Sequence, residues 1–361
     1  MDNKNKQLKD YGPLQTKRVK FIYDDDDDYF PLTPEYDNNI TPYNSDDDKE
    51  LVIINTTPIN NLIDLIELGI LYDNTKKYNI DMKVLNKLVD PLTELNNMIG
   101  METVKQDMID HILFRIQKLD NENKDMMHTV ISGSPGVGKT EVARIIGKIY
   151  LAMGILKNDK FIKATRSNLI AGYLGQTAKA TQTIIDSAIG GILFIDEVYS
   201  LGNAEKRDSF AKECIDTINE NLTEKKTEFI CIIAGYKEEI DKCFFSFNPG
   251  LERRFPIKFT IEEYNFEELF LIFKKKITDC NWMLDENITN KFFKKNMDCF
   301  KFFGGDMEVL FNRCKRAHSR RIFCTDERKK IINMDDLKKG FDVFKKHQKK
   351  KNNEFMKSMF I

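Results

Sequence analysis

The chain has 361 residues, of which 41% are hydrophobic and 31% charged, a composition that fits a globular protein with room for two compact domains and tails. Its 56 lysines and arginines nearly balance its 57 aspartates and glutamates, so net charge alone implies neither a nucleic-acid nor a membrane partner. The 7 cysteines stand singly, with no metal-binding or disulfide spacing, which points to a reducing compartment. The start of the chain is too polar for a secretory leader, and no apolar run could span a bilayer. We therefore expect an intracellular, soluble (cytoplasmic) protein.

The N-terminal part of the chain is acidic and lacks periodicity. Asp24–Asp28 and Asp46–Asp48 carry much of its charge, and Asn, Tyr and Pro fill much of the rest, so we expect residues 1–50 to be a disordered acidic arm. Residues 51–90 are expected to form a short helical extension, with Thr57 as the helix cap. Its apolar stripe is more simply explained by packing on the main domain than by a partner.

Residues 91–260 alternate short apolar runs with amphipathic patterns, which predicts a layered α/β domain with a five-stranded parallel sheet flanked by helices. The predicted strands are Thr129–Ser132, Phe161–Ala164, Ile192–Ile195, Phe229–Ala234 and Ile257–Thr260.

After Thr260 the strand pattern stops and helical patterns follow. Residues 261–345 are therefore expected to form an all-α lid domain, and residues 346–361, with their lysine run, a solvated basic tail. The predicted lid helices are Phe266–Ile277, Ile288–Met297, Met307–Arg321 and Met334–Phe344.

The segment Gly133–Thr140 reads G-S-P-G-V-G-K-T and fits the phosphate-loop pattern G-x-x-x-x-G-K-[ST] without deviation. It follows a predicted strand and opens an apolar-faced helix, which is the context that the pattern requires. Glycine-rich backbone turns its amides toward an anion, and the helix N-terminus adds its positive dipole end. We expect this loop to bind ATP through Gly133, Ser134, Pro135, Gly136, Val137, Gly138, Lys139, Thr140 and Glu141.

Two adjacent carboxylates, Asp196 and Glu197, end the predicted strand Ile192–Ile195. The C-terminal strand ends of a parallel sheet line the ligand crevice, so we expect Asp196 to ligate magnesium together with the Thr140 hydroxyl. Glu197 is expected to polarise the attacking water as general base. These features predict an ATPase that uses ATP and Mg²⁺.

The chain resembles the AAA+ ATPase superfamily, and within it the CbbX/CfxQ-like branch that includes red-type Rubisco activases and sporulation AAA proteins. The likeness runs from about Pro91 to Arg321 and implies a P-loop NTPase (AAA+) α/β domain with a C-terminal helical lid. The stretches that carry it are Leu95–Gly100, GSPGVGKT, YLGQT from Tyr173, GGILFIDEVYSL, IIAGYKEEID and NPGLERRFP.

The resemblance also implies roles for residues outside the phosphate loop. Ile99 and Gly100 match the stretch that borders adenine. Tyr173, Leu174 and Gly175 match a pore loop whose aromatic side chain grips a substrate polypeptide, although an ordinary loop aromatic is the plainer alternative for Tyr173.

Arg253 and Arg254 match the region that supplies an arginine finger to the neighbouring subunit, and Arg254 is the first choice. For Arg253 an ordinary surface position is an equal alternative. A finger acting in trans would make hydrolysis depend on oligomerisation, because a single subunit lacks that charge in the transition state.

The sequence departs from the AAA+ pattern in two places, one at the end of the fourth strand and one in the helical lid. Many AAA+ proteins end the fourth strand in a water-orienting Asn, whereas this branch and this chain read Ala-Gly-Tyr236 there. The more serious departure is Glu308, which stands where the pattern places the second-domain sensor arginine, and a carboxylate cannot contact a phosphate favourably. Arg313 lies more than one helical turn further on and is a weak substitute.

The main functional hypothesis is a homo-hexameric ring that uses ATP hydrolysis to remodel a protein client. One alternative is a nucleotide-gated scaffold with little turnover, which the missing sensor arginine favours and Glu197 opposes. The other is a nucleic-acid-associated loader. It is the least favoured, because the terminal lysine run lacks interleaved aromatics.

Overall fold

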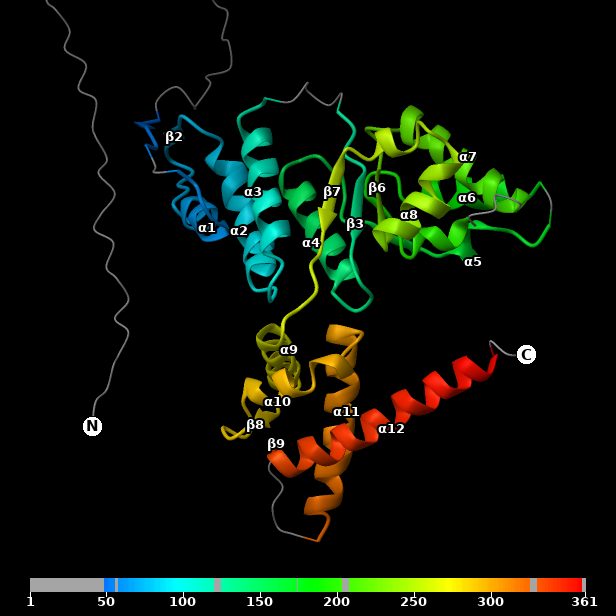
Figure 1. The fold of residues 1–361 in the computed structure, drawn as a ribbon. Coiled ribbons are helices and arrows are strands. Elements are labelled where there is room, and N and C mark those ends of the chain that lie inside the picture. The colour runs from blue at the N-terminus through cyan, green and yellow to red at the C-terminus, as the bar shows by residue number, and fades with distance from the viewer. Residues whose placement is uncertain are drawn as a thin grey trace, which may run out of the picture.

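The structure is a computed structural model, and it describes residues 49–55, 58–119, 125–173, 175–202, 208–324 and 330–358. The expected acidic arm therefore lies almost entirely outside the described residues. Figure 1 shows an α/β body and a smaller, mainly helical body, connected by the chain that follows the last strand of the sheet.

A five-stranded, all-parallel sheet in the order β4-β5-β6-β3-β7 forms the centre of the α/β body. The prediction of five strands is confirmed, and only β6 begins one residue later than expected. β3, β5 and β6 are buried along their whole length, which is why their sequences read as continuous apolar runs. The strands are β3 (Thr129–Ser132), β4 (Phe161–Ala164), β5 (Ile192–Ile195), β6 (Ile230–Gly235) and β7 (Ile257–Thr260).

Helices cover both faces of this sheet. Alternate residues of one strand pack into different hydrophobic clusters, so that Phe194 packs toward α2–α4 and Leu193 toward α6 and α7. The helices are α2 (Met82–Asn96), α3 (Glu102–Ile116), α4 (Lys139–Ala152), α5 (Arg166–Leu169), α6 (Thr177–Ser187), α7 (Ser209–Glu224) and α8 (Lys237–Cys243), with 3-10 turns η1 (Val198–Leu201), η2 (Phe245–Phe247) and η3 (Glu252–Arg254).

The N-terminal extension contains α1 (Leu62–Ile70) and a short parallel pair of strands, β1 (Leu51–Val52) and β2 (Lys77–Tyr78). The expected cap was wrong. Asn61 and Asp64 form a capping box, in which each side chain accepts a hydrogen bond from the other residue's backbone amide, so the helix begins at Leu62. α1 packs on α2, and α2 packs on α4, so that Leu62 and Leu65 are buried by the chain itself, whereas Ile63 on the expected apolar stripe keeps 48% of its surface exposed.

The lid is mainly helical, with one small difference from the expected all-α domain. Two strands of two residues pair in parallel within it, and such short strands leave no periodicity in the sequence. Its core is rich in phenylalanine, as expected, and includes Phe273, Phe293 and Phe311. The elements are α9 (Phe266–Asp279), β8 (Met283–Leu284), α10 (Asn290–Lys295), η4 (Met297–Cys299), α11 (Phe303–Ile322), β9 (Ile331–Ile332) and α12 (Met334–Ser358).

Two expected boundaries fall inside helices. Position 91 lies within α2, and position 346 lies within α12, which continues to Ser358 instead of giving way to a separate tail. Phe341 and Phe344 anchor α12 on the lid, and no glycine or proline follows them to stop it. Across the part of the chain that the structure describes, no helix is both long and apolar enough to cross a membrane.

Candidate functional site

The phosphate loop connects β3 to α4 in the conformation that its glycines allow. Gly136 and Gly138 have φ values of 79° and 99°, which a side chain with a Cβ disfavours. α4 begins at Lys139, directly after the loop, so its N-terminal amides and positive dipole end face the same space.

Lys139 is buried, with 6% of its surface exposed. Its Nζ donates hydrogen bonds to the carbonyl oxygens of Gly133 and Ser134, at 2.9 and 3.0 Å. Burial lowers the pKa of this ammonium, while Glu197 and Asp196 oppose that shift. The Lys139 ammonium can exchange these hydrogen bonds to loop carbonyls for hydrogen bonds to a phosphate.

The two carboxylates at the end of β5 point into different surroundings. The Asp196 Oδ2 atom accepts a hydrogen bond from Lys163 Nζ at 2.7 Å. Glu197 has a left-handed backbone, with φ of 51°, and its buried Oε2 atom has no hydrogen-bond partner among the described residues. A buried, unpaired carboxylate oxygen is costly, and such atoms occur at catalytic positions.

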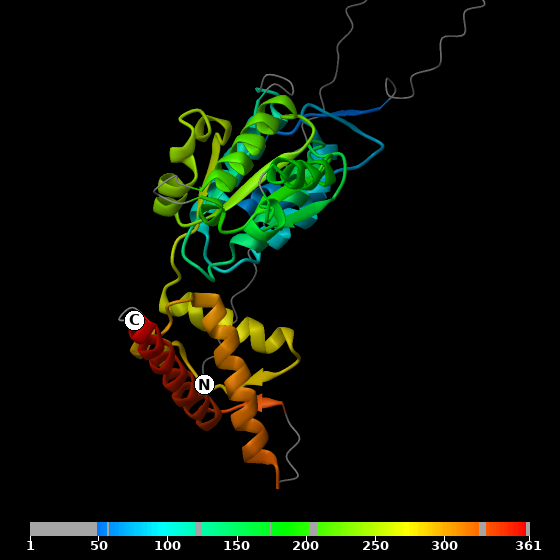
Figure 2. The same ribbon diagram turned by 90° about the vertical axis from the view of Figure 1, so that its right-hand side faces the viewer.

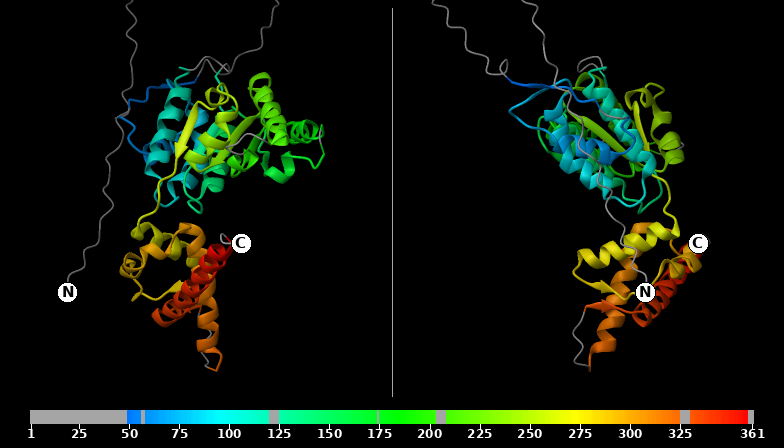
Figure 3. Two further views of the ribbon diagram at one scale, coloured as in Figure 1. Left: turned by 45° about the vertical axis from the view of Figure 1, so that its right-hand side comes forward. Right: turned by 90° about the vertical axis from the view of Figure 1, so that its left-hand side faces the viewer.

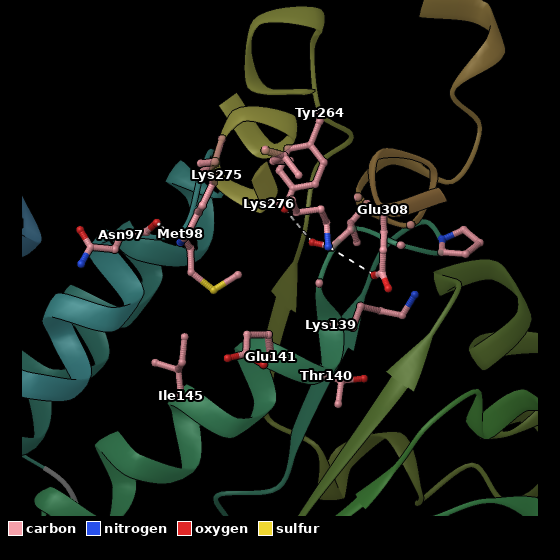
Figure 4. Close-up of a pocket in the computed structure, with 18 of the residues that line it drawn as sticks. Asn97, Met98, Lys139, Thr140, Glu141, Ile145, Tyr264, Lys275, Lys276 and Glu308 are labelled. Carbon is pink, nitrogen blue, oxygen red and sulfur yellow. Dashed lines mark hydrogen bonds and ion pairs between the residues drawn. The ribbon is translucent and has the colours of Figure 1, made fainter. Parts of the chain in front are cut away.

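A cleft of about 1030 Å³ joins these residues to the lid. Figure 4 shows Lys139 and Thr140 on one side of it and Tyr264, Lys276 and Glu308 on the lid side. The predicted site residues that line it are Ile99, Pro135, Gly136, Val137, Gly138, Lys139, Thr140, Glu141, Asp196 and Glu197.

Three residues expected to bind nucleotide do not line this cleft. Gly133 and Ser134 lie at the base of the loop, where the Ser134 hydroxyl donates to Glu263 at 2.8 Å. Gly100, with φ of 66°, faces the Glu268 side chain, so it shapes the turn before α3.

Met98 and Tyr264 form the apolar end of the cleft, beside Ile99. Met98 and Met101 lie 3.6 and 3.2 Å from the position that a Cβ on Gly138 would occupy, and the Tyr264 hydroxyl donates to the Val137 carbonyl at 2.8 Å. Burial raises the pKa of Tyr264 to about 12, so it stays a donor at neutral pH. This end has the apolar lining that a purine base requires.

The lid touches the phosphate loop directly. The amide of Gly304, at the start of α11, donates to the Gly136 carbonyl at 3.1 Å. A Cβ at Gly136 would collide with the Phe302 carbonyl oxygen. Figures 2 and 3 show α11 running from this contact away from the α/β body.

Glu308 does line the cleft, and it is paired with a cation. Lys276 Nζ on α9 lies 3.4 Å from Glu308 Oε2, and Lys276 lines the same cleft. Arg313 instead lines a separate groove with Arg316 and Arg320 and does not line this cleft. Sequence reasoning missed Lys276, since nothing local marks a lysine whose partner lies on another helix 32 residues away.

Tyr236 directly follows the C-terminal end of β6. β6 lies between β3 and β5, so its C-terminal end lies between the phosphate loop and the carboxylates. Lys139 Nζ is 5.7 Å from the Tyr236 ring centre, and Tyr199 packs against that ring. Burial, Glu197 and Glu263 raise the pKa of Tyr236, which keeps it a neutral donor beside the acids.

The two candidate finger arginines differ in their surroundings. Arg254 is half-buried, and its guanidinium donates to the Thr223 hydroxyl and the Gly250 carbonyl, both at 2.7 Å. Arg253 is exposed, and the described residues offer it no hydrogen bond or ion pair. Neither lines the cleft of its own chain.

Tyr173 lies on the loop between α5 and α6, with 74% of its surface exposed. Gly172 and Gly175 flank it in open space, with no other atoms within 4 Å of a Cβ placed on either. The third expected residue of this loop, Leu174, is outside the described residues.

The donor set fits magnesium bound together with a triphosphate. A Mg²⁺ ion is held by one or two protein oxygens plus phosphates and water, and Thr140 and Asp196 supply such oxygens. Among the described residues, no group of three or more His, Cys, Asp or Glu side chains could hold a metal by itself.

The fold and site define a P-loop nucleoside triphosphatase: a glycine loop and helix N-terminus after one parallel strand, and an acid pair after another. The family model "ATPase family associated with various cellular activities (AAA)" matches residues 129–263. A solved FIGL-1 AAA domain in complex with ADP superposes with a TM-score of 0.50 over 69% of this chain and 83% of that one, at 17% identity.

Relatives narrow the class further. A cfxQ-like protein of Acanthamoeba polyphaga mimivirus is 42% identical over 92% of this chain and 79% of its own length. Stage V sporulation protein K of Bacillus subtilis is 36% identical over 65% of this chain and 76% of its own length. A chloroplastic ribulose bisphosphate carboxylase/oxygenase activase of Cyanidioschyzon merolae is 32% identical over 65% of this chain and 80% of its own length. The chain belongs to the CbbX/CfxQ-like branch of the AAA ATPases, and it binds nucleotide and hydrolyses ATP.

Proposed function

We propose that this ATPase assembles into a homo-hexameric ring and remodels a protein client through the loop around Tyr173. The exposure of Tyr173 carries the proposal, because a large aromatic side chain in open space between two glycines has no role in packing this chain. The relatives named as activases of a carboxylase act on a protein, which supports protein as the class of client.

The same loop is connected to the acid pair. α5 leads into it, and Arg166 on α5 donates to the carbonyls of Ser200 and Leu201, both at 2.8 Å. These residues belong to η1, which directly follows Glu197. A change at the acid pair therefore has a short contact path to Tyr173.

In the proposed hydrolysis step, a water oxygen attacks the γ-phosphorus, the bond from that phosphorus to the β-bridging oxygen breaks, and ADP and phosphate leave. Glu197 Oε2, to which none of the described residues donates a hydrogen bond, accepts the water proton. Lys139 would contact the β- and γ-phosphates, and Thr140 and Asp196 would hold Mg²⁺. The bound ion would supply charge neutralisation at the phosphate oxygens.

The transition state needs further positive charge, which we assign to two sources. An arginine of the neighbouring subunit, Arg254 or Arg253, reaches the γ-phosphate in trans. Arg254 would first have to leave Thr223 and Gly250, whereas Arg253 is already exposed. From the lid, Lys276 supplies the cation that Glu308 cannot.

The test is the ATPase rate per subunit measured against protein concentration, with light scattering to follow assembly. We expect the rate to rise as rings form. A rate that stays negligible in assembled protein would favour the nucleotide-gated scaffold instead.

Mixing experiments identify the finger. Arg253→Ala and Arg254→Ala proteins are each mixed with Glu197→Gln protein, which is inactive itself but has both arginines. Activity should return only for the variant that lacks the true finger, because its intact Glu197 then faces a complete neighbour. No recovery in either mixture would argue against a shared site.

A further inference from the structure

A basic groove lies on the lid, apart from the nucleotide cleft. It has a volume of about 550 Å³ and lies between α11 and α12. Arg313, Arg316 and Arg320 on α11 are spaced by three to four residues, so they share one helix face. The lining residues are Arg313, Arg316, Ala317, Arg320, Arg321, Lys339, Asp342 and Val343.

Most of this charge has no acidic partner among the residues that the structure describes. Arg321 is paired with the buried Asp336 at 3.1 Å. Arg313, Arg316, Arg320 and Lys339 have no ion pair or hydrogen bond to other described side chains, and Asp342 is the only acid lining the groove. Several like charges this close repel one another, so an anionic ligand would stabilise the groove.

The groove also has apolar surface. Val343 is 40% exposed, and Ala317 lies on the opposite helix. A ligand that matches both features carries several carboxylates next to apolar or aromatic side chains. This pattern fits an acidic peptide better than an inorganic anion.

The chain contains such a peptide. Asp24–Asp28 is a run of five aspartates, preceded by Tyr23 and followed by Tyr29 and Phe30. About 20 residues connect this run to the first described residue, and a chain of that length can span up to about 70 Å. We propose that the groove between α11 and α12 binds the chain's own segment around Asp24–Asp28.

Zero-length carbodiimide crosslinking of the full-length protein tests this, because it joins a carboxylate only to an amine in contact with it. We expect crosslinks between Asp24–Asp28 and Lys339, with yield falling as salt is raised. The Glu94–Lys148 pair, at 2.6 Å, is the internal reference for a stable ion pair. Absence of an arm-to-lid crosslink, while the reference forms, would overturn the proposal.

Matched charge reversals locate the contact. Arg316→Glu with Arg320→Glu should abolish the crosslink, whereas Lys237→Glu with Lys242→Glu, an equal charge change on exposed α8, should leave it. Circular dichroism checks that both variants are folded. A crosslink that survives the α11 changes would show that the arm contacts another surface and would overturn the assignment.

A binding measurement adds a readout that needs no crosslink. A labelled peptide of residues 20–32 is titrated into full-length protein whose five aspartates, Asp24–Asp28, are replaced by Asn. We expect it to bind about tenfold more tightly than to the unaltered chain, whose own arm competes for the groove. Equal affinity for both proteins, or affinity unaffected by Arg316→Glu with Arg320→Glu, would contradict the proposal.

Discussion

At the scale of single residues, the charged side chains of the cleft differ in whether they have partners within the chain. Lys139 is buried among loop carbonyls, and Asp196 is paired with Lys163, so neither charge is left bare in the cleft. Glu197 is the contrast, because its buried Oε2 has no hydrogen-bond partner in the part of the chain that the structure describes. Unpaired burial of this kind costs stability and is consistent with a catalytic base.

The pairing of Lys276 with Glu308 leads to a prediction about the lid cation. Lys276→Ala should lower kcat about tenfold, corresponding to about 1.4 kcal/mol, because the transition state loses a nearby positive charge. Lys276→Arg should retain most of the rate.

Steady-state ATPase kinetics provide the measurement, with kcat and KM separated. Lys274→Ala is the matched control, since Lys274 lies on the same helix, is exposed and does not line the cleft. Equal losses in the Lys274 and Lys276 variants would show that Lys276 has no specific role.

At the scale of elements, the contact between the phosphate loop and the start of α11 fixes the lid. Gly136→Ala places a methyl group against the Phe302 carbonyl, so α11 must move away. We expect the Gly304 amide to lose its protection in hydrogen exchange, because its acceptor is the Gly136 carbonyl.

Gly154→Ala is the control for backbone strain. Gly154 has φ of 74°, close to the 79° of Gly136, but nothing lies within 4 Å of its Cβ position. Both substitutions should cost about 1 kcal/mol through the left-handed backbone, and only Gly136→Ala should expose α11. Unchanged exchange at residues 303–308 in Gly136→Ala would mean that the loop does not position the lid.

The sequence patterns predict the strands, the phosphate loop and the acid pair of this site. They do not predict the contacts between elements that lie far apart in the chain. The central strands are buried on both faces, so they stood out as apolar runs, and the phosphate loop and acid pair are local motifs. The pairing of Lys276 with Glu308 and the contact of Gly304 with Gly136 join segments far apart in the chain and left no local signal. Strands of two residues, such as β8, are too short to show a period.

At the scale of the whole molecule, a buried histidine links stability to pH. His128 is fully buried in the α/β body, where its Nδ1 accepts from the Cys231 amide and its Nε2 lies 3.1 Å from the Leu222 carbonyl. Burial lowers the pKa of His128 to about 4 from 6.5. The unfolded chain therefore binds a proton that the folded chain does not, and stability falls as pH drops from 6.5 to 4.

This shift predicts a loss of about 2 kcal/mol in the free energy of unfolding between pH 7 and pH 5 from His128 alone. Urea unfolding at both pH values, followed by circular dichroism, measures it. His128→Asn should reduce the pH dependence by that amount, whereas His347→Asn, at an exposed position on α12, should not. The same pH dependence in His128→Asn and the unaltered chain would contradict the assignment.

The helix α11 connects the phosphate loop with the basic groove at the far side of the lid. This helix of 20 residues is about 30 Å long, with its first turn on the phosphate loop and its second half in the basic groove. A tilt of about 10° at the loop would displace the far end by about 5 Å, given that length. A change at the phosphate loop that tilts α11 would therefore be enlarged at the basic groove, and a ligand bound in that groove would oppose the tilt.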